Sequence, residues 1–242
     1  MKRLVTIVFI FTALSNETFS AEFSMSAGSG GIFGYTFTRY TMEGGGARSF
    51  QRMDRVDYAG FLFFDATYAE FSIMLQGGKN SYEENMALKS ASLGDDNGTG
   101  TTASLGFSLT GKYPFSITDS ISWFPLLGIE YHTALIEKRK PNGYDSEYSR
   151  TDGIEPSDRN KNDNAYPLSA WNSFWIDLGV GLDYSISSPL FIRTELLFGF
   201  RLPTNYELGA LEVVKKQLNI QDPKLAGLTG NPAMKIAIAY RL

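Results

Sequence analysis

Alternation between apolar and polar residues, with a period of two, runs through most of the chain. Successive side chains of a β-strand point to opposite faces, so this pattern predicts strands with one apolar and one polar face. It is clearest at the C-terminus, where Met234, Ile236, Ile238 and Tyr240 share one face and Lys235 lies on the other. Eight such strands are predicted, at 22–40, 55–66, 68–77, 101–113, 121–135, 171–186, 190–202 and 233–242.

The connections between these strands alternate between short and long. Strands two and three, four and five, and six and seven are joined by short turns, whereas the connections 41–54, 78–100, 137–170 and 203–231 are long and polar. Outer-membrane barrels show this alternation, with turns in the periplasm and longer loops outside. Closure also covers the apolar edge that the last strand would otherwise expose. The pattern therefore predicts an all-β, eight-stranded antiparallel up-and-down transmembrane β-barrel with long external loops. A secreted β-sandwich or lipocalin-like barrel is the alternative.

Aromatic residues support the membrane assignment. They make up 14% of the chain, beside 24 glycines, a mixture that suits strands and turns. Their predicted positions cluster at the strand ends, as expected for girdles at two membrane–water interfaces. One rim would carry Tyr68, Tyr113, Trp123, Tyr184 and Tyr240, and the other Tyr58, Tyr131, Trp171 and Phe200.

The first twenty residues have the features of a secretory signal peptide. Lys2 and Arg3 precede an apolar run from Leu4 to Leu14, and small residues lie before Ala21. We expect residues 1–20 to be removed and 21–242 to form one barrel domain, and a buried N-terminal helix is the alternative.

The chain has no cysteine, which excludes disulfides and thiolate chemistry. Its formal net charge of −4 argues against nucleic-acid partners.

The last long connection contains a helical signal. Residues 204–207 have the spacing of a capping box, and apolar residues recur at helical spacing up to a stop near Asp222 and Pro223. This predicts a short amphipathic helix in an external loop. We expect its apolar stripe to rest on the barrel rim or on neighbouring loops, and contact with the membrane surface or a partner is the alternative.

Charged residues within the predicted strands fall on the inward face. Because the interior of an eight-stranded barrel is just wide enough for side chains to fill, and an unpaired buried charge is costly, we expect these charges to pair as an ionic network that plugs the lumen. A conducting or proton-relaying pathway is the alternative. The predicted lumen residues are Asp57, Glu70, Lys112, Glu130, Asp177, Asp183, Arg193, Glu195, Arg201, Lys235 and Arg241.

The single histidine, His132, shares its face with Glu130. It could serve as a general base for a lipid-modifying enzyme, but nucleophilic catalysis needs a serine or similar group within hydrogen-bond reach. Thr133 and Ala134 follow it, so no His-x-Ser spacing is present. We therefore expect a rim histidine with no catalytic role, no enzymatic activity and no cofactor. One histidine, no cysteine and no calcium-loop spacing also predict no metal site.

Three segments resemble known proteins. Residues 63–70 (FFDATYAE), 124–131 (FPLLGIEY) and 240–242 (YRL) are similar to segments of spirochaetal members of the small outer-membrane barrels, the OmpX/OmpA-domain/OmpW group. The resemblance implies an eight-stranded barrel whose last strand is read by the barrel-assembly machinery, through an aromatic or apolar final residue and an aromatic two positions earlier. Tyr240 fits that signal, and Leu242 departs from the commoner terminal Phe.

These observations predict an integral protein of the cell outer membrane, with lipid and the assembly machinery as partners. Its loops would act at the surface in adhesion, shielding or envelope integrity, and the 137–170 loop would be available to host or matrix ligands. A narrow channel or transporter for small solutes, hydrophobic ones included, is the alternative that the OmpW resemblance implies.

Overall fold

The computed structural model describes residues 24–44, 47–88, 91–141, 148–150, 172–204 and 224–242. Its long strands are β1 (Met25–Gly44), β2 (Ala47–Ala66), β3 (Ala69–Leu88), β4 (Ala91–Lys112), β6 (Ile121–Pro141), β8 (Ser173–Ser185), β9 (Leu190–Arg201) and β10 (Lys224–Arg241). Two short strands, β5 (Phe115–Thr118) and β7 (Tyr148–Arg150), both pair with β6.

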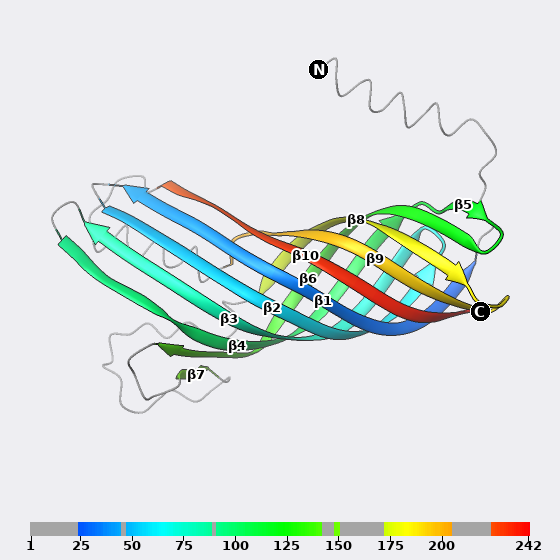
Figure 1. Cartoon of the computed structure of the whole chain (residues 1–242), viewed down its shortest axis with the longest axis horizontal. Helices are drawn as coiled ribbons and strands as arrows, with labels where there is room; N and C mark the ends of the chain where they lie inside the picture. The colour runs from blue at the N-terminus through cyan, green and yellow to red at the C-terminus, as the bar shows by residue number, and fades with distance from the viewer. Residues whose placement is uncertain (1–23, 45–46, 89–90, 142–147, 151–171, 205–223) are drawn as a thin grey trace, which may run out of the picture.

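The eight long strands form a closed ring (Figure 1). Each pairs antiparallel with the next along the chain, and β4 pairs with β6 beyond the short hairpin that β5 forms. The ring closes between β1 and β10, where Ser29 is opposite Ile238 and Ala27 is opposite Tyr240. The predicted all-β, up-and-down barrel is confirmed, and the C-terminal edge has β1 as its partner.

Two of the four predicted long loops are wrong. The segments 41–54 and 78–100 are mostly strand, because β1 continues to Gly44, β2 begins at Ala47, β3 continues to Leu88 and β4 begins at Ala91. These parts of the strands are rich in polar and charged residues and contain few large apolar ones. Figure 1 shows β1 to β4 continuing at one end of the barrel well beyond β8 and β9. A sheet that rises above the bilayer has water outside it, so it no longer needs an apolar outer face, and its sequence resembles that of a loop.

The other two predicted loops are partly outside the described residues. In 137–170, β6 runs to Pro141 and β7 covers 148–150, and in 203–231, β10 begins at Lys224. The predicted signal peptide (1–20) and nearly all of the predicted loop helix (205–223) lie outside the described residues. No helix in the described part of the chain is long and apolar enough to cross a membrane.

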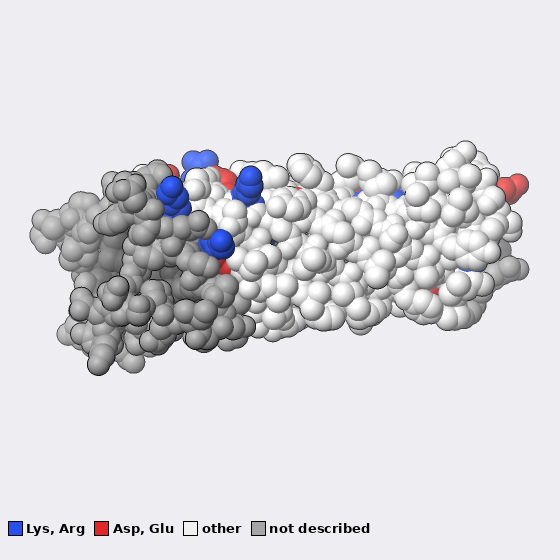
Figure 2. All heavy atoms as spheres, turned by 90° about the horizontal axis from the view of Figure 1, so that it is seen from below, with Lys and Arg blue, Asp and Glu red and all other residues white. Residues whose placement is uncertain are grey.

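A continuous apolar band surrounds the barrel. On β2 the outward-facing apolar side chains extend from Val56 to Phe64, and among them Leu62 is 66% exposed. This length matches the roughly 9–11 residues with which a tilted strand crosses a bilayer. Figure 2 shows the band from one side, largely without charged side chains, while Lys, Arg, Asp and Glu gather near one end. Apolar exposure on this scale marks an interaction surface, and a ring of it around a closed barrel fits lipid.

The short turns lie at the end of the barrel that also holds the chain's C-terminus (Figure 1). Between β2 and β3, Thr67 has a φ of 45°, which is uncommon for a β-branched residue. Its hydroxyl accepts a hydrogen bond from the Ser24 amide at 2.7 Å and donates to the Ser24 carbonyl at 2.9 Å. These bonds fasten the residue before β1 to the β2–β3 turn.

One irregularity in the ring affects the interior. Ala103 pairs with Ile136 and Ser104 pairs with Ala134, so Leu135 has no residue opposite it. This β-bulge leaves Leu135 and Ile136 both exposed and turns Glu137 inward. A bulge bends its strand and re-aims neighbouring side chains. Here it lies beside the side chains of Ser104 and His132 in the lumen.

Candidate functional site: the barrel lumen

Strand alternation brings all eleven of the predicted lumen residues to the inward phase of their strands. Six of them are buried: Asp57, Glu70, Lys112, Arg193, Glu195 and Lys235. The remaining five are half-buried: Glu130, Asp177, Asp183, Arg201 and Arg241. They do not form one cluster, because they divide between a group near the short-turn end of the barrel and a group further towards the loop end.

The first group is centred on Arg193. Its guanidinium donates to Asp183 at 2.8 and 2.7 Å, to Glu70 at 2.5 Å and to Asp65 at 2.8 Å. The Lys112 ammonium reaches the same Asp65 oxygen at 2.6 Å. Three carboxylates therefore surround two cations in a space closed to solvent, and each charge has a partner of the opposite sign. Such a cluster is stable only while every member is present.

Aromatic rings fill the space around this cluster. The Arg193 guanidinium carbon lies 5.1 Å from the ring centres of Phe63 and Phe124, and 5.3 Å from that of Phe191. Phe124 and Phe191 are themselves 1% and 2% exposed. A desolvated guanidinium over aromatic faces gains cation–π attraction in addition to its ion pairs. Charge and rings together block the lumen at this depth.

Asp65 and Arg55 belong to the lumen but were missed from the sequence. Asp65 is eight residues from Asp57, an even spacing that places both on the inward face of β2. Arg55 has the same phase, and its Nε lies 2.6 Å from Asp57 Oδ1. The period-two pattern could have identified both residues. What it could not show is that Asp65 contacts Arg193, because that contact crosses the barrel.

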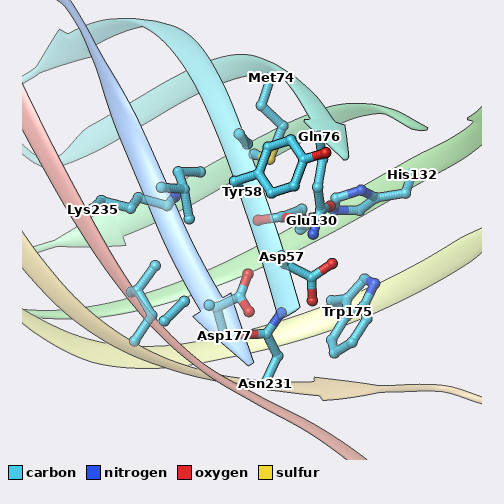
Figure 3. A pocket seen from close by; sticks show the side chains of 15 residues that line it. Asp57, Tyr58, Met74, Gln76, Glu130, His132, Trp175, Asp177, Asn231 and Lys235 are labelled. Carbon is cyan, nitrogen blue, oxygen red and sulfur yellow. Dashed lines mark hydrogen bonds and ion pairs between the residues drawn. The ribbon is translucent and has the colours of Figure 1, made fainter. Parts of the chain in front are cut away.

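The second group surrounds a small polar cavity of about 40 Å³. Figure 3 shows Glu130, His132, Asp177 and Lys235 directed into it from β6, β8 and β10, together with Asp57 from β2. The register places Glu195 opposite Lys235 across the β9–β10 pair. The ammonium of Lys235 also lies 5.7 Å from the ring centre of Phe61. Several carboxyl groups therefore share one buried lysine.

His132 has partners on both ring nitrogens. Nε2 is hydrogen bonded to Glu130 Oε1, and Nδ1 is 3.2 Å from Ser104 Oγ. The ring also packs against Trp175, edge to face, with centres 6.4 Å apart. The sequence spacing around His132 contains no serine, but the neighbouring strand β4 supplies one. His132 is 6% exposed, so it faces the lumen and not the lipid.

A second cavity, of about 50 Å³, lies on the loop side of His132. His132 and Trp175 line both cavities and separate them. Arg55, Asn80 and Arg201 also line the outer cavity. Asn80 is 5% exposed, and neither its amide nitrogen nor its amide oxygen has a hydrogen-bond partner among the described residues. The cavity therefore presents unsatisfied polar groups.

No set of three or more His, Asp or Glu side chains in the described ranges is arranged to hold a metal ion.

Charges outside the membrane band form a separate group at the loop end. Burial raises the pKa of Asp54, but hydrogen bonds from Arg39, Tyr35 and Arg52 outweigh it and lower that pKa to about 2. Asp54 lies just beyond Val56, where the apolar face of β2 begins. This cluster links β1 to β2 at the outer rim.

No protein-family model matches the sequence, and no curated protein gives a significant match. Solved outer-membrane proteins align with most of the chain, at TM-scores below 0.5. The outer-membrane protease OmpT from Escherichia coli is 8% identical, with 93% of this chain and 100% of that chain covered and a TM-score of 0.45. Neisserial surface protein A is 8% identical over 88% and 97% of the two chains, with a TM-score of 0.37. Ail from Yersinia pestis, bound to the heparin analogue sucrose octasulfate, is 13% identical over 89% and 99%, with a TM-score of 0.30. These similarities concern the fold alone.

Proposed function

We propose that the chain is an integral outer-membrane barrel that presents its loop end outside the cell, in adhesion, shielding or envelope integrity. The apolar band and the closed ring support membrane insertion. The orientation is supported by the short turns, which lie at the same end as the C-terminus, and by the extension of β1 to β4 at the other end, because outer-membrane barrels have short periplasmic turns and longer extracellular parts. Residues 1–20 would be the signal peptide that directs export, and N-terminal sequencing of the mature protein should then begin at Ala21.

The observation that carries this proposal is the closed lumen at Arg193. A guanidinium held by Asp65, Glu70 and Asp183 and enclosed by aromatic rings leaves no open path for solutes at that depth. The protein would therefore act through its surfaces and not as a pore. Outer-membrane lipid is its first partner, and host or matrix components are candidate ligands for the 137–170 loop.

Planar-bilayer recording of the refolded protein tests the closed lumen. We expect no steady openings from the wild type. Replacing Arg193 with Ala should produce openings, whereas Arg241→Ala should not. Arg241 lies at the short-turn end, where it donates to Ser185 and Ser188 and lies 5.2 Å from the ring centre of Phe191, and among the described ion pairs it has none with the carboxylates around Arg193. Steady openings from the wild type would support the alternative of a narrow channel and overturn the closed barrel.

Cysteine labelling tests the orientation. The chain contains no cysteine, so each introduced thiol is unique. Lys140→Cys lies at the loop end and Asp119→Cys in the β5–β6 turn, and both positions are exposed. On intact cells, a membrane-impermeant maleimide should label only Lys140→Cys, while both variants should be labelled after lysis. Labelling of the turn position on intact cells would reverse the orientation.

We further propose that Tyr240 and Leu242 form the signal for the barrel-assembly machinery. Both side chains are exposed at the end of β10, 53% and 74% respectively, and both are available to a partner before the ring closes. Tyr240→Ala should lower the folded fraction in cells, and Leu242→Phe should preserve or raise it. Heat-dependent gel mobility of extracted membranes measures that fraction. An unchanged folded fraction in Tyr240→Ala would show that Tyr240 is not part of the assembly signal.

A further inference from the structure

Three side chains in the outer half of the lumen form a hydrogen-bonded chain. Ser104 on β4 contacts Nδ1 of His132 on β6 at 3.2 Å, and the opposite ring nitrogen contacts Glu130 on the same strand. A hydroxyl, an imidazole and an orienting carboxylate in this order are the components of nucleophilic acyl transfer. We propose that Ser104 is a nucleophile that cleaves short-chain esters entering the lumen from the loop end, with His132 as general base and Glu130 as its orienting partner.

The hydrogen bonds select the tautomer that this chemistry needs. With its proton on Nε2, His132 donates to the Glu130 carboxylate, and Nδ1 is left as an acceptor for the Ser104 hydroxyl. The edge-to-face contact with Trp175 holds the imidazole ring in that orientation. Glu130 lies two residues before His132 on one strand face, so the backbone fixes the acid and base together.

The local fold positions the nucleophile beside a cavity. The β4–β6 register is continuous from Lys112 to Ser104, so Ser104 is opposite Ala134, two residues along β4 from the Gly106 that is opposite His132, and the bulge at Leu135 shifts the pairing only beyond Ser104. Ser104 and His132 both line the outer cavity. So do the guanidinium-bearing Arg55 and Arg201, which are the positive charges that could stabilise a developing oxyanion there.

The cavity limits the substrate. Its volume of about 50 Å³ is one third of the roughly 150 Å³ cavity that accommodates benzene. An acetyl group fits such a space, and a long acyl chain does not. The buried, unpartnered amide of Asn80 in the same cavity favours a polar occupant, such as an acetylated sugar or alcohol, over a hydrocarbon.

The reaction balances without a cofactor. Ser104 Oγ attacks the ester carbonyl, its proton moves to His132 Nδ1, and the C–O bond to the leaving alcohol breaks as that proton is delivered to the alcohol oxygen. Water then attacks the acetyl-serine, with His132 again taking the proton, and releases acetate and free Ser104. Glu130 keeps the imidazole aligned and stabilises the imidazolium that forms in each half-reaction.

Labelling with methanesulfonyl fluoride, whose sulfonyl group is about the size of an acetyl group, tests the nucleophile. The refolded full-length mature barrel, incubated with the reagent and analysed by intact mass and peptide mapping, should carry one methanesulfonyl adduct on Ser104. Ser104→Ala should carry none. Ser108→Ala is the matched control, because Ser108 is on the same face of β4 but bonds Ser72 at 2.5 Å and not His132. It should label like the wild type, and an unlabelled wild type would overturn the proposal.

Turnover of p-nitrophenyl acetate tests the triad. We expect Ser104→Ala to abolish hydrolysis, Glu130→Gln to lower kcat on the order of 10²–10⁴-fold with a smaller change in KM, and Ser108→Ala to leave it unchanged. The wild type should hydrolyse p-nitrophenyl octanoate far more slowly than the acetate. Heat-dependent gel mobility confirms that each variant is folded. Equal hydrolysis by folded wild type and Ser104→Ala would exclude Ser104 as the nucleophile, whatever the outcome for the closed lumen.

Discussion

Arg193 is the residue whose loss should damage the interior most. Replacing it with Met keeps much of the side-chain volume but leaves Asp65, Glu70 and Asp183 buried without that cation. Breaking a buried ion pair in this way costs about 3–5 kcal/mol. We expect Arg193→Met to lower the free energy of unfolding by that amount, measured by urea titration in lipid vesicles. Arg241→Met should cost less than about 1 kcal/mol, and equal effects of the two would contradict a central role for Arg193.

Gly181 permits a close approach inside the ring. A Cβ at this position would lie 2.1 Å from two ring carbons of Phe124, which is buried against Arg193 and cannot easily move. Gly181→Ala should therefore destabilise the barrel by about 1–3 kcal/mol. Gly60→Ala is the control, because a Cβ there meets no atom within 4 Å. The same urea titration measures both, and a neutral Gly181→Ala would show that the Phe124 ring can shift.

At the scale of strands, the outer rim of β1 and β2 is held by Asp54. Its pKa of about 2 lies below the ordinary aspartate pKa of 3.8, so the ionised form is favoured by folding. The resulting stability is present above about pH 4 and is lost as the pH falls through about 2. Because the pair with Arg39 is partly exposed, we expect a contribution below about 1 kcal/mol. A carboxyl titration by NMR should give a midpoint near 2. A midpoint near 4 would show that the rim contacts do not form in solution.

The sequence predicts the faces of the strands better than their ends or contacts. The outward set Met234, Ile236, Ile238 and Tyr240 has the same phase in the structure, because lipid on one side enforces strict alternation. That constraint stops where a strand leaves the bilayer, so the polar ends of β1 to β4 have a sequence pattern that also predicts loops. The contact between Ser104 and His132 joins β4 to β6, and no local residue pattern specifies the register between two strands.

At the scale of the whole molecule, the barrel has three levels with different chemistry. The short-turn half is closed by the Arg193 cluster, the middle holds the cavity around His132, and the loop end extends as a polar sheet beyond the apolar band. The residues that close the lumen are therefore different from those around His132. The buried ion pairs close the lumen towards the short-turn end. Any solute that reaches Ser104 must therefore arrive from the loop end.

Arginine substitutions inside and outside the apolar band test whether the whole barrel is inserted in a membrane. Leu62 is 66% exposed within the apolar band, so in lipid an arginine there should cost up to about 2–4 kcal/mol. Ser81 is also exposed and outward-facing, but it lies on β3 beyond the band, and arginine there should cost little. Urea titration of Leu62→Arg and Ser81→Arg in vesicles measures the difference. A soluble barrel would tolerate both alike, because an exposed arginine in water carries no desolvation cost, so equal stabilities would overturn the membrane assignment.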